Sequence, residues 1–429
     1  MLGAVNRFHV MAKPIGPVCN LRCDYCYYLH NWDRSAQDVE WRMSDHTLER
    51  FVEQYLRSQE GEVIEFSWQG GEPTLMGLDF FEKVVEVQRK HCPPGKRVTN
   101  SIQTNGTVVD ERWCAFLRRN NFLVGLSIDG PRELNDAYRL GREGISTFDQ
   151  TLLASKLLRK HGVEFNTLTV VHDLNSKRPL QVYNFLRNIV GSRNMQFIPC
   201  VEPQTYRTEP PLAWSGPLPV LGSPEARPKA HSSFVTGWSV DPDDFGDFLC
   251  SIFDRWISTD VGRVFILTFE MALAAWMGLP PTLCTMARHC GRALALEHDG
   301  KVYTCDHFVY PEYLLGSIED VELSDLANQE SQVRFGRDKW DRLTGQCRKC
   351  EALFVCHGDC PKNRFLVAPD GQPGLSYLCS GLLKFYRHID PGMRYMAREV
   401  SAGRPASTVM AFASKGGGAR PFGHPASRS

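Results

Sequence analysis

The sequence has 429 residues, in which 49 Lys and Arg residues balance 49 Asp and Glu residues. This length exceeds what one ordinary core holds and predicts a large α/β domain with a smaller second domain. The balanced charge gives no argument for a nucleic-acid or membrane-surface partner, and we expect neither. The stretch 1–16 lacks the apolar segment of a signal peptide, and the apolar stretch 265–281 is too short for a membrane span and carries Glu270. We therefore expect a cytoplasmic protein.

Strand-like and helix-like segments alternate in the first half of the chain. Ser44 and Asp110 are expected N-caps of two helices, and Gly162 is the expected stop of a third. Alternation at a spacing of about 30 residues implies a parallel sheet, and six such units suggest an incomplete (β/α)6 barrel of the TIM type. The expected strands are 7–14, 62–71, 97–106, 122–130, 164–173 and 194–202.

Glycine and polar residues gather where these strands end. In barrels of this type the C-terminal strand ends build the active site. The loop 17–30, which follows the first strand and contains three cysteines, opens on the same face. The other informative strand ends are 69–73, 103–106, 127–130 and 200–202.

The rest of the chain divides by composition. Residues 203–236 are rich in Pro and Ser and predict an inserted surface loop, a domain boundary and a lid. We place the first domain at 1–240 and a helical linker with a cysteine-rich domain at 241–395. The remainder, 396–429, is rich in Gly, Ser and Ala and is expected to be disordered.

Fifteen cysteines in a reducing compartment are not expected to form disulfides. Four of them stand apart, at Cys92, Cys114, Cys200 and Cys250, and are expected to be small buried apolar residues. The other eleven fall into three groups, for which metal ligation is the leading interpretation.

The first group is Cys19, Cys23 and Cys26, spaced C-x3-C-x2-C. A structural zinc site and an iron–sulfur cubane held by protein alone each require four ligands. Three thiolates leave one iron of a [4Fe–4S] cluster open for a small molecule. Zinc, or a cysteine-rich loop without function, remains an alternative on this motif alone.

This loop, with aromatic residues around Cys26 and Gly-Gly-Glu-Pro at 70–73, resembles the radical S-adenosylmethionine (SAM) superfamily. The resemblance implies that the open iron binds the methionine amino and carboxylate groups of SAM. A guanidinium suits a carboxylate. The alternatives are a solvated helix charge for Arg139 and a core residue for Val201. The residues that the resemblance implies in SAM contact are Tyr25, Gly70, Gly71, Glu72, Ser127, Arg139 and Val201.

The remaining eight cysteines match the spacing of the SPASM domain. The resemblance implies two auxiliary [4Fe–4S] clusters and thus three clusters in the chain. The implied ligands are Cys284, Cys290, Cys305 and Cys360 for one cluster, and Cys347, Cys350, Cys356 and Cys379 for the other. Spacing alone leaves two zinc sites open, with His289 and His357 as nearby donors.

Asp306 directly follows Cys305. A lone Asp is usually a turn or surface residue, but residues from about 5 to 395 resemble the anaerobic sulfatase-maturating enzymes, whose proposed catalytic base stands at this position. The resemblance implies abstraction of a hydrogen atom from the Cβ of a peptidyl Cys or Ser by a 5′-deoxyadenosyl radical. Deprotonation by Asp306 and electron transfer to an auxiliary cluster then yield Cα-formylglycine, directly from serine and after hydrolysis with loss of the sulfur from cysteine. The insert 203–236 and the tail depart from the resemblance.

The implied partners are an unfolded or nascent sulfatase polypeptide and a low-potential electron donor such as flavodoxin or ferredoxin. Three other functions stay open from the residues. The first is a SPASM maturase that makes crosslinks in a ribosomal peptide. The others are a zinc-stabilised binding module and a ferredoxin-like electron carrier.

Overall fold

Ten strands form one sheet within residues 7–28 and 41–411, which are the residues that this computed structural model describes. The strand order is β10-β9-β8-β1-β2-β3-β4-β5-β6-β7. Neighbours from β8 through β1 to β7 are parallel, and β9 and β10 are antiparallel additions. The strands of the first half are β1 (His9–Lys13), β2 (Val63–Trp68), β3 (Arg97–Thr104), β4 (Phe122–Ser127), β5 (Phe165–Val171) and β6 (Asn194–Pro199). The others are β7 (Phe265–Ile266), β8 (Ala293–Glu297), β9 (Lys301–Tyr303) and β10 (Leu314–Ser317).

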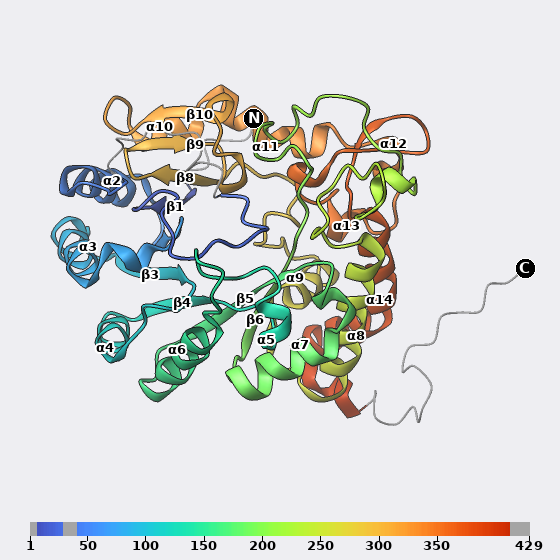
Figure 1. Cartoon of the computed structure of the whole chain (residues 1–429), viewed down its shortest axis with the longest axis horizontal. Helices are drawn as coiled ribbons and strands as arrows, with labels where there is room; N and C mark the ends of the chain where they lie inside the picture. Colours follow the sequence, from blue (N-terminus) through green and yellow to red (C-terminus); the bar gives the residue numbers. More distant parts are fainter. Residues whose placement is uncertain (1–6, 29–40, 412–429) are drawn as a thin grey trace, which may run out of the picture.

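The six strands expected in the first half are confirmed, and they alternate with helices as in a barrel. Figure 1 shows α2, α3, α4 and α6 along the outer side of the sheet. β1 pairs with β8 and not with β6, so the barrel stays open. The fold is thus the expected α/β partial barrel with a C-terminal cysteine-rich domain. The helices of the first half are α2 (Asp45–Ser58), α3 (Leu78–His91), α4 (Glu111–Arg119), α5 (Arg132–Asn135), α6 (Phe148–Lys160) and α7 (Pro179–Phe185).

Local signals account for the ends of these helices. The hydroxyl of Ser44 accepts a hydrogen bond from the Thr47 amide at 3.0 Å, and Asp110 accepts one from the Trp113 amide at 2.8 Å. Both side chains therefore satisfy an amide that the first helical turn leaves unpaired. After α6 the chain turns at Gly162 with φ +64°, a conformation that favours glycine.

Aromatic rings fill the space between the sheet and the outer helices. Phe51 of α2 meets Phe66 and Trp68 of β2 with ring centroids 5.5 and 6.0 Å apart. The Trp68 indole nitrogen donates to the Asn100 side-chain oxygen at 2.8 Å, so its polar atom is satisfied inside the core. Each fully buried ring of this kind contributes about 1.5–3 kcal/mol.

The second half adds helices and the short strands that the sequence analysis missed. β7 lies inside the stretch expected to be helical, and β8, β9 and β10 extend the sheet beyond β1 (Figure 1). Strands of two to five residues carry little local pattern, and here their partners are distant in the chain. The helices are α8 (Pro242–Thr259), α9 (Leu267–Trp276), α10 (Leu323–Asn328), α11 (Glu330–Asp341), α12 (Gly345–Arg348), α13 (Leu353–Cys356) and α14 (Cys379–Ser401). Among the described helices, none has the length and hydropathy to cross a membrane.

The expected disorder from residue 396 is wrong for residues 396–411. Helix α14 continues to Ser401, and the side chains of Met396 and Val409 are fully buried. These apolar side chains pack into the main hydrophobic core, and this packing outweighs the flexible composition around them. Residues 412–429, the rest of the expected tail, lie outside the described residues.

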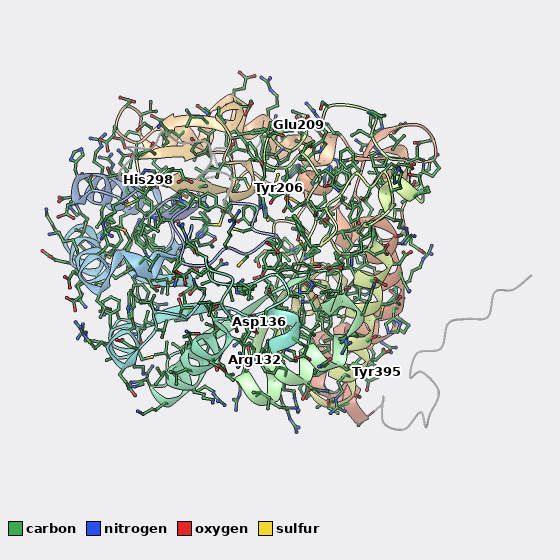
Figure 2. All side chains as sticks on the ribbon, viewed as in Figure 1. Arg132, Asp136, Tyr206, Glu209, His298 and Tyr395 are labelled. Carbon is green, nitrogen blue, oxygen red and sulfur yellow. The ribbon has the colours of Figure 1, made fainter. Side chains whose placement is uncertain are left out.

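The insert 203–236 is exposed along much of its length and also packs onto both halves of the chain. Figure 2 labels Tyr206 of this insert near the middle of the view. The Tyr310 hydroxyl donates to the Tyr206 carbonyl at 2.8 Å, and the Tyr313 hydroxyl donates to the Pro211 carbonyl at 2.6 Å. The insert therefore forms part of the wall between the barrel and the cysteine-rich domain, and a lid role stays a prediction.

Helices α8 and α14 cross so closely that glycine is required at the contact. A Cβ built on Gly381 would lie 1.7 Å from the Pro242 carbonyl oxygen. We predict that Gly381→Ala destabilises the fold by about 2 kcal/mol because the helices must separate. Thermal unfolding measures this loss. Gly61→Ala is the control, since its added Cβ makes an ordinary contact at 3.5 Å. Equal melting temperatures for both variants would contradict the close crossing.

Candidate functional site

The first cysteine group lies in the loop that follows β1. Cys23 is buried, and Cys19 and Cys26 are partly buried. Burial raises the pKa of the Cys19 thiol to about 12, and Glu72 and Cys26 add to the rise. Burial likewise raises the pKa of Cys23, to which Cys26 and Cys19 contribute. The three thiols therefore lie close enough to interact electrostatically. In this buried site, thiolates require a bound cationic group.

The Gly-Gly-Glu-Pro segment after β2 forms a cradle for this loop. The amides of Gly71 and Glu72 donate to the carbonyls of Gly16 and Val18, each at 2.8 Å. A Cβ on Gly71 would lie 2.0 Å from the Val18 oxygen, and Gly70 has φ +117°. Only glycine allows this approach, and it places the end of β2 against the cysteine loop.

Glu72 and Asn105 connect the ends of β2 and β3 to the same loop. The buried Glu72 carboxylate accepts from the Thr104 hydroxyl and the Asn105 amide, both at 2.7 Å. Burial raises the pKa of Glu72 despite these hydrogen bonds. The Asn105 side-chain amide approaches the Cys19 sulfur at 3.8 Å. The ends of β2 and β3 therefore meet at the cysteine loop.

Tyr25 and Arg139 lie together in the buried region beside this loop. The Tyr25 hydroxyl donates to Asp129 and accepts from the Arg139 Nη1 at 3.0 Å. Arg139 is 8% exposed, so it is not a solvated helix charge. Its Nε is buried and has no hydrogen-bond partner among the described residues. A buried guanidinium with a vacant donor fits an added carboxylate.

Ser127 and Val201 occupy different positions. Ser127 is buried at the C-terminal end of β4, on the same edge as Asp129. The Val201 side chain belongs to the main hydrophobic core, whereas Tyr25 and Cys23 belong to a separate small cluster. The Val201 carbonyl accepts from the Lys362 Nζ at 2.6 Å, so this segment also contacts the cysteine-rich domain.

Asp306 stands where β1, the cysteine loop and the cysteine-rich domain converge. Its carboxylate forms an ion pair with the Lys13 Nζ at 2.5 Å and accepts a hydrogen bond from the Tyr27 hydroxyl. Burial raises the pKa of Asp306, but Lys13, His307 and Tyr27 outweigh it and the net pKa is below the ordinary value. The neighbouring Tyr28 hydroxyl contacts Glu297 at 2.6 and 2.7 Å.

Lys13 and Lys362 are site residues that the sequence analysis did not identify. Lys13 is 1% exposed at the end of β1, with its Nζ 3.8 Å from the Tyr28 ring centroid. The sequence did contain a signal for Lys13, because this lysine ends an apolar strand on the side where the site was expected. Lys362 is paired with Glu202 at 2.7 Å, and no local pattern distinguishes it from a surface lysine.

Two buried cations accompany the cysteine set Cys284, Cys290, Cys305 and Cys360. Burial raises the pKa of each thiol, and other thiols of this set contribute to the rise at Cys290, Cys305 and Cys360. The Lys339 ammonium donates to the carbonyls of Cys284 and Thr285, and the Arg364 guanidinium donates to the Lys339 carbonyl at 2.6 Å. These cations suit a set of anionic thiolates.

The other four cysteines surround one cavity. Its volume is about 380 Å³, and Cys347, Cys350, Cys356 and Cys379 all line it. Burial raises the pKa of Cys356 and of Cys379 to about 12, and Cys347 raises both further. Lys349 and Arg387 also line this cavity. Space and donors for a group larger than one ion are therefore present.

Single-ion geometry is not formed at these sites. In residues 7–28 and 41–411, no three Cys, His, Asp or Glu side chains are gathered closely enough for one metal ion. Each thiolate of a cubane binds a different iron, so the sulfurs of a cluster site surround a space instead of a point. His289 is exposed, and His357 contacts the Met286 carbonyl at 2.7 Å.

Two family models match the chain. The model of the radical SAM superfamily matches residues 14–186, and the model of an iron–sulfur cluster-binding domain, SPASM, matches residues 284–351. The fold and site thus define a radical SAM protein with a SPASM domain.

Curated relatives and solved structures narrow this class. A serine-type anaerobic sulfatase-maturating enzyme of Bacteroides thetaiotaomicron is 43% identical over 406 residues, covering 94% of this chain and 94% of that protein. A cysteine-type anaerobic sulfatase-maturating enzyme of Clostridium perfringens is 32% identical, and the match covers 91% of this chain and 98% of that protein. The protein in the solved structure of anSMEcpe with bound AdoMet is 32% identical in sequence. That structure has a TM-score of 0.77, and the match covers 91% of this chain and 99% of that chain. The chain belongs to the family of anaerobic sulfatase-maturating enzymes.

The buried Lys339 provides a test of the cation pair. We predict that Lys339→Met lowers the free energy of unfolding by about 2 kcal/mol, because two carbonyls lose a charged donor. Thermal unfolding and iron content of the anaerobically purified protein measure the effect. The control is Lys156→Met, since Lys156 is exposed on α6, away from the cysteine sets. Unchanged unfolding of the Lys339 variant would contradict the role of its hydrogen bonds.

Proposed function

We propose that this chain is a radical SAM oxidoreductase that converts a peptidyl serine or cysteine of a sulfatase polypeptide to Cα-formylglycine. The 43% identity to a serine-type enzyme and 32% identity to a cysteine-type enzyme support this substrate class. A structure of anSMEcpe with AdoMet and the Cp18Cys peptide, which has a TM-score of 0.77 to this chain, supports a peptide substrate.

The observation that carries the proposal is the contact of Asp306 with Lys13 and Tyr27. Asp306 follows Cys305 of the cysteine-rich domain, Lys13 ends β1, and Tyr27 follows Cys26. One carboxylate is therefore in contact with the barrel edge and with both cysteine-bearing segments. A substrate side chain at this junction would reach a proton acceptor beside two cluster sites.

The cysteine sets and the buried residues beside them support an assignment of each cofactor to particular residues. We assign Cys19, Cys23 and Cys26 to the cluster with an open iron, and Tyr25, Gly70, Gly71, Glu72, Ser127, Arg139 and Val201 to SAM. Each of the two four-cysteine sets holds an auxiliary [4Fe–4S] cluster. When bound, these groups supply hydrogen-atom abstraction and one-electron oxidation.

The chain's own residues supply position and proton transfer. Arg139 offers a buried guanidinium for the SAM carboxylate, and Tyr25 holds that guanidinium in place at 3.0 Å. Asp306 takes the proton of the substrate hydroxyl or thiol, with Lys13 and Tyr27 fixing its carboxylate. The insert contacts Tyr310 and Tyr313 of the cysteine-rich domain and thereby helps to exclude water from the junction.

One-electron cleavage of SAM requires an electron donor, and iron–sulfur clusters and free thiols suit a reducing compartment. We infer a low-potential one-electron donor such as flavodoxin or ferredoxin. No disulfide joins the fifteen cysteines, all of which lie in the part of the chain that the structure describes, as expected in the reducing cytoplasm. We infer that the protein acts there on an unfolded or nascent sulfatase polypeptide.

Mass spectrometry of a peptide substrate tests the proposed function. The anaerobically reconstituted protein is incubated with SAM, a reductant and a sulfatase-motif peptide carrying Ser, Cys or Ala at the target position. We expect an aldehyde from the Ser or Cys peptide and no change in the Ala peptide. Unchanged Ser and Cys peptides alongside SAM cleavage would contradict the substrate class and favour a crosslinking maturase.

The proposed role of Asp306 predicts that its substitution lowers aldehyde formation more than SAM cleavage. Asp306→Asn is expected to lower aldehyde formation about a hundred-fold or more, because the proton acceptor is lost, while SAM cleavage falls much less. Both products are measured in one assay, and iron content reports cluster assembly. Asp320→Asn, an exposed change in the same domain, is the control. Equal losses of both products would remove the proton-acceptor role.

The close packing of the Gly-Gly-Glu-Pro segment against the cysteine loop predicts that a substitution there removes one cluster and leaves the other two. Gly71→Ala brings a Cβ against the Val18 carbonyl and is expected to displace the loop. The iron content should fall by about a third, the share of one of three clusters. Gly61→Ala is again the control, because its added Cβ makes only an ordinary contact, 3.5 Å from the Val63 carbonyl oxygen. Full iron content and SAM cleavage in Gly71→Ala would contradict the assignment of this loop.

A further inference from the structure

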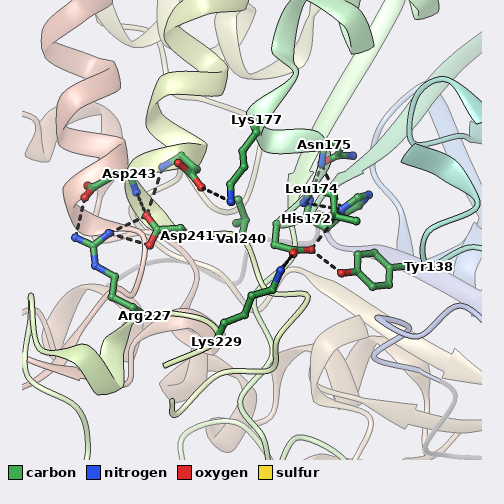
Figure 3. A network of polar contacts seen from close by, with 12 residues as sticks. Tyr138, His172, Leu174, Asn175, Lys177, Arg227, Lys229, Val240, Asp241 and Asp243 are labelled. Carbon is green, nitrogen blue, oxygen red and sulfur yellow. Dashed lines mark hydrogen bonds and ion pairs between the residues drawn. The ribbon is translucent and has the colours of Figure 1, made fainter. Parts of the chain in front are cut away.

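Two cations of the insert reach two separate groups of carboxylates, as Figure 3 shows. Arg227 contacts Asp241 and Asp243 at the start of α8, each at 2.8 Å. Lys229 forms an ion pair with Asp173, which follows β5. Arg227 and Lys229 belong to the same insert, but only the contact of Lys229 with Asp173 is connected through further residues to the cysteine loop.

Asp173 is a buried carboxylate whose charge has few compensating groups. Its side chain is 4% exposed, whereas that of Lys229 is 57% exposed. The Tyr138 hydroxyl donates to Asp173 at 2.8 Å, and the His172 ring nitrogen lies 3.8 Å from it. Burial raises the pKa of Asp173, but His172, Lys229 and Tyr138 together bring it below the ordinary value. Lys229 supplies the permanent positive charge of this group.

Tyr138 connects Asp173 to the cysteine loop. Its carbonyl accepts from the Asp24 amide at 3.0 Å, and the Leu140 carbonyl accepts from the Arg22 amide at 2.8 Å. Arg139 stands between these two anchored residues. The position of the Arg139 guanidinium therefore depends on how firmly Tyr138 is held.

The aromatic rings of this region reinforce the same connection. The His172 ring stacks on Tyr25 at 6.3 Å and meets Tyr138 edge-on at 4.9 Å. Tyr25 in turn holds Arg139 through its hydroxyl. A shift of Asp173 or Tyr138 thus reaches Arg139 by two routes, one through the backbone and one through Tyr25.

We propose that Lys229 of the insert is a positioning residue for SAM. By pairing with the buried Asp173, Lys229 keeps that carboxylate in place to accept the Tyr138 hydroxyl. Tyr138 then holds the segment 138–140 against the cysteine loop and Arg139 in position for the SAM carboxylate. The inference rests on SAM binding in the proposed function but not on the peptide substrate.

The insert has other attachments, so Lys229 is not required to hold it in place. Leu221 donates its amide to the Val367 carbonyl at 3.0 Å, and Val235 is fully buried. The Tyr310 and Tyr313 hydroxyls bind insert carbonyls as described above. Lys229 itself has φ +64°, a strained conformation for a residue with a side chain. A contact that is maintained despite this strain is consistent with a specific role for its ammonium group.

Equilibrium dialysis of SAM tests the proposal without turnover. The protein is reconstituted anaerobically and dialysed against labelled SAM in the absence of reductant. Lys229→Met is expected to weaken SAM binding about five-fold, within the range of coupled neighbouring residues, and Lys229→Arg should restore it. Hydrogen exchange at the Arg22 and Asp24 amides should be faster in Lys229→Met, because Tyr138 is held less firmly.

Arg227→Met is the matched control, since Arg227 ties the same insert to α8. It should lower thermal stability slightly and leave the dissociation constant for SAM unchanged. In an Asp173→Asn background, Lys229→Met should add no further loss, because the buried charge is gone. An unchanged SAM affinity in Lys229→Met, equal losses in the Arg227 and Lys229 variants, or an undiminished loss in the Asn background would each overturn the proposal.

A failure of the proposed function is distinguishable from a failure of this inference. If the peptide assay gives no aldehyde while SAM binding depends on Lys229, the substrate class is wrong and the positioning role stands. If aldehyde forms and SAM binding is insensitive to Lys229, the positioning role is wrong and the function stands.

Discussion

The parallel pairing of β1 with β8 is the constraint on which the site depends. His9 to Lys13 pair residue by residue with Ala293 to Glu297, so a strand of the cysteine-rich domain continues the barrel sheet. This register places Lys13 beside the segment that leads through β9 to Asp306, and it brings Glu297 to Tyr28. The cysteine loop and the cysteine-rich domain are thereby fixed relative to each other by backbone hydrogen bonds as well as by side chains.

Compensated buried charge is the second feature of the junction. Lys13 pairs with Asp306, and Lys362 pairs with Glu202, both with little exposure to solvent. Such pairs contribute little net stability, because desolvation offsets their attraction, but removal of one partner is costly. They therefore determine where side chains lie more than how stable the fold is. The proposed site requires such fixed positions, because a substrate would lie there between a proton acceptor and cluster ligands.

The sequence predicted the parts of the site that are local in the chain. The loop with Cys19, Cys23 and Cys26 and the strand end at Gly70 and Gly71 were identifiable because spacing and glycine have direct geometric consequences. Lys13, Lys362 and Lys229 were missed because each pairs with a carboxylate far away in the chain. The strands β7 to β10 were missed for the same reason, since strands this short depend on distant partners. The end of α14 was misjudged because composition does not reveal the buried face that Met396 joins.

The central claim is that the Cβ of a substrate serine or cysteine is oxidised at this junction by SAM-dependent chemistry. A sulfatase-motif peptide deuterated at the Cβ of its target residue tests this claim most directly. We expect deuterium to appear in the 5′-deoxyadenosine formed from SAM and the peptide to become an aldehyde. Deuterium retained in full by the peptide, or 5′-deoxyadenosine without deuterium while aldehyde forms, would contradict it.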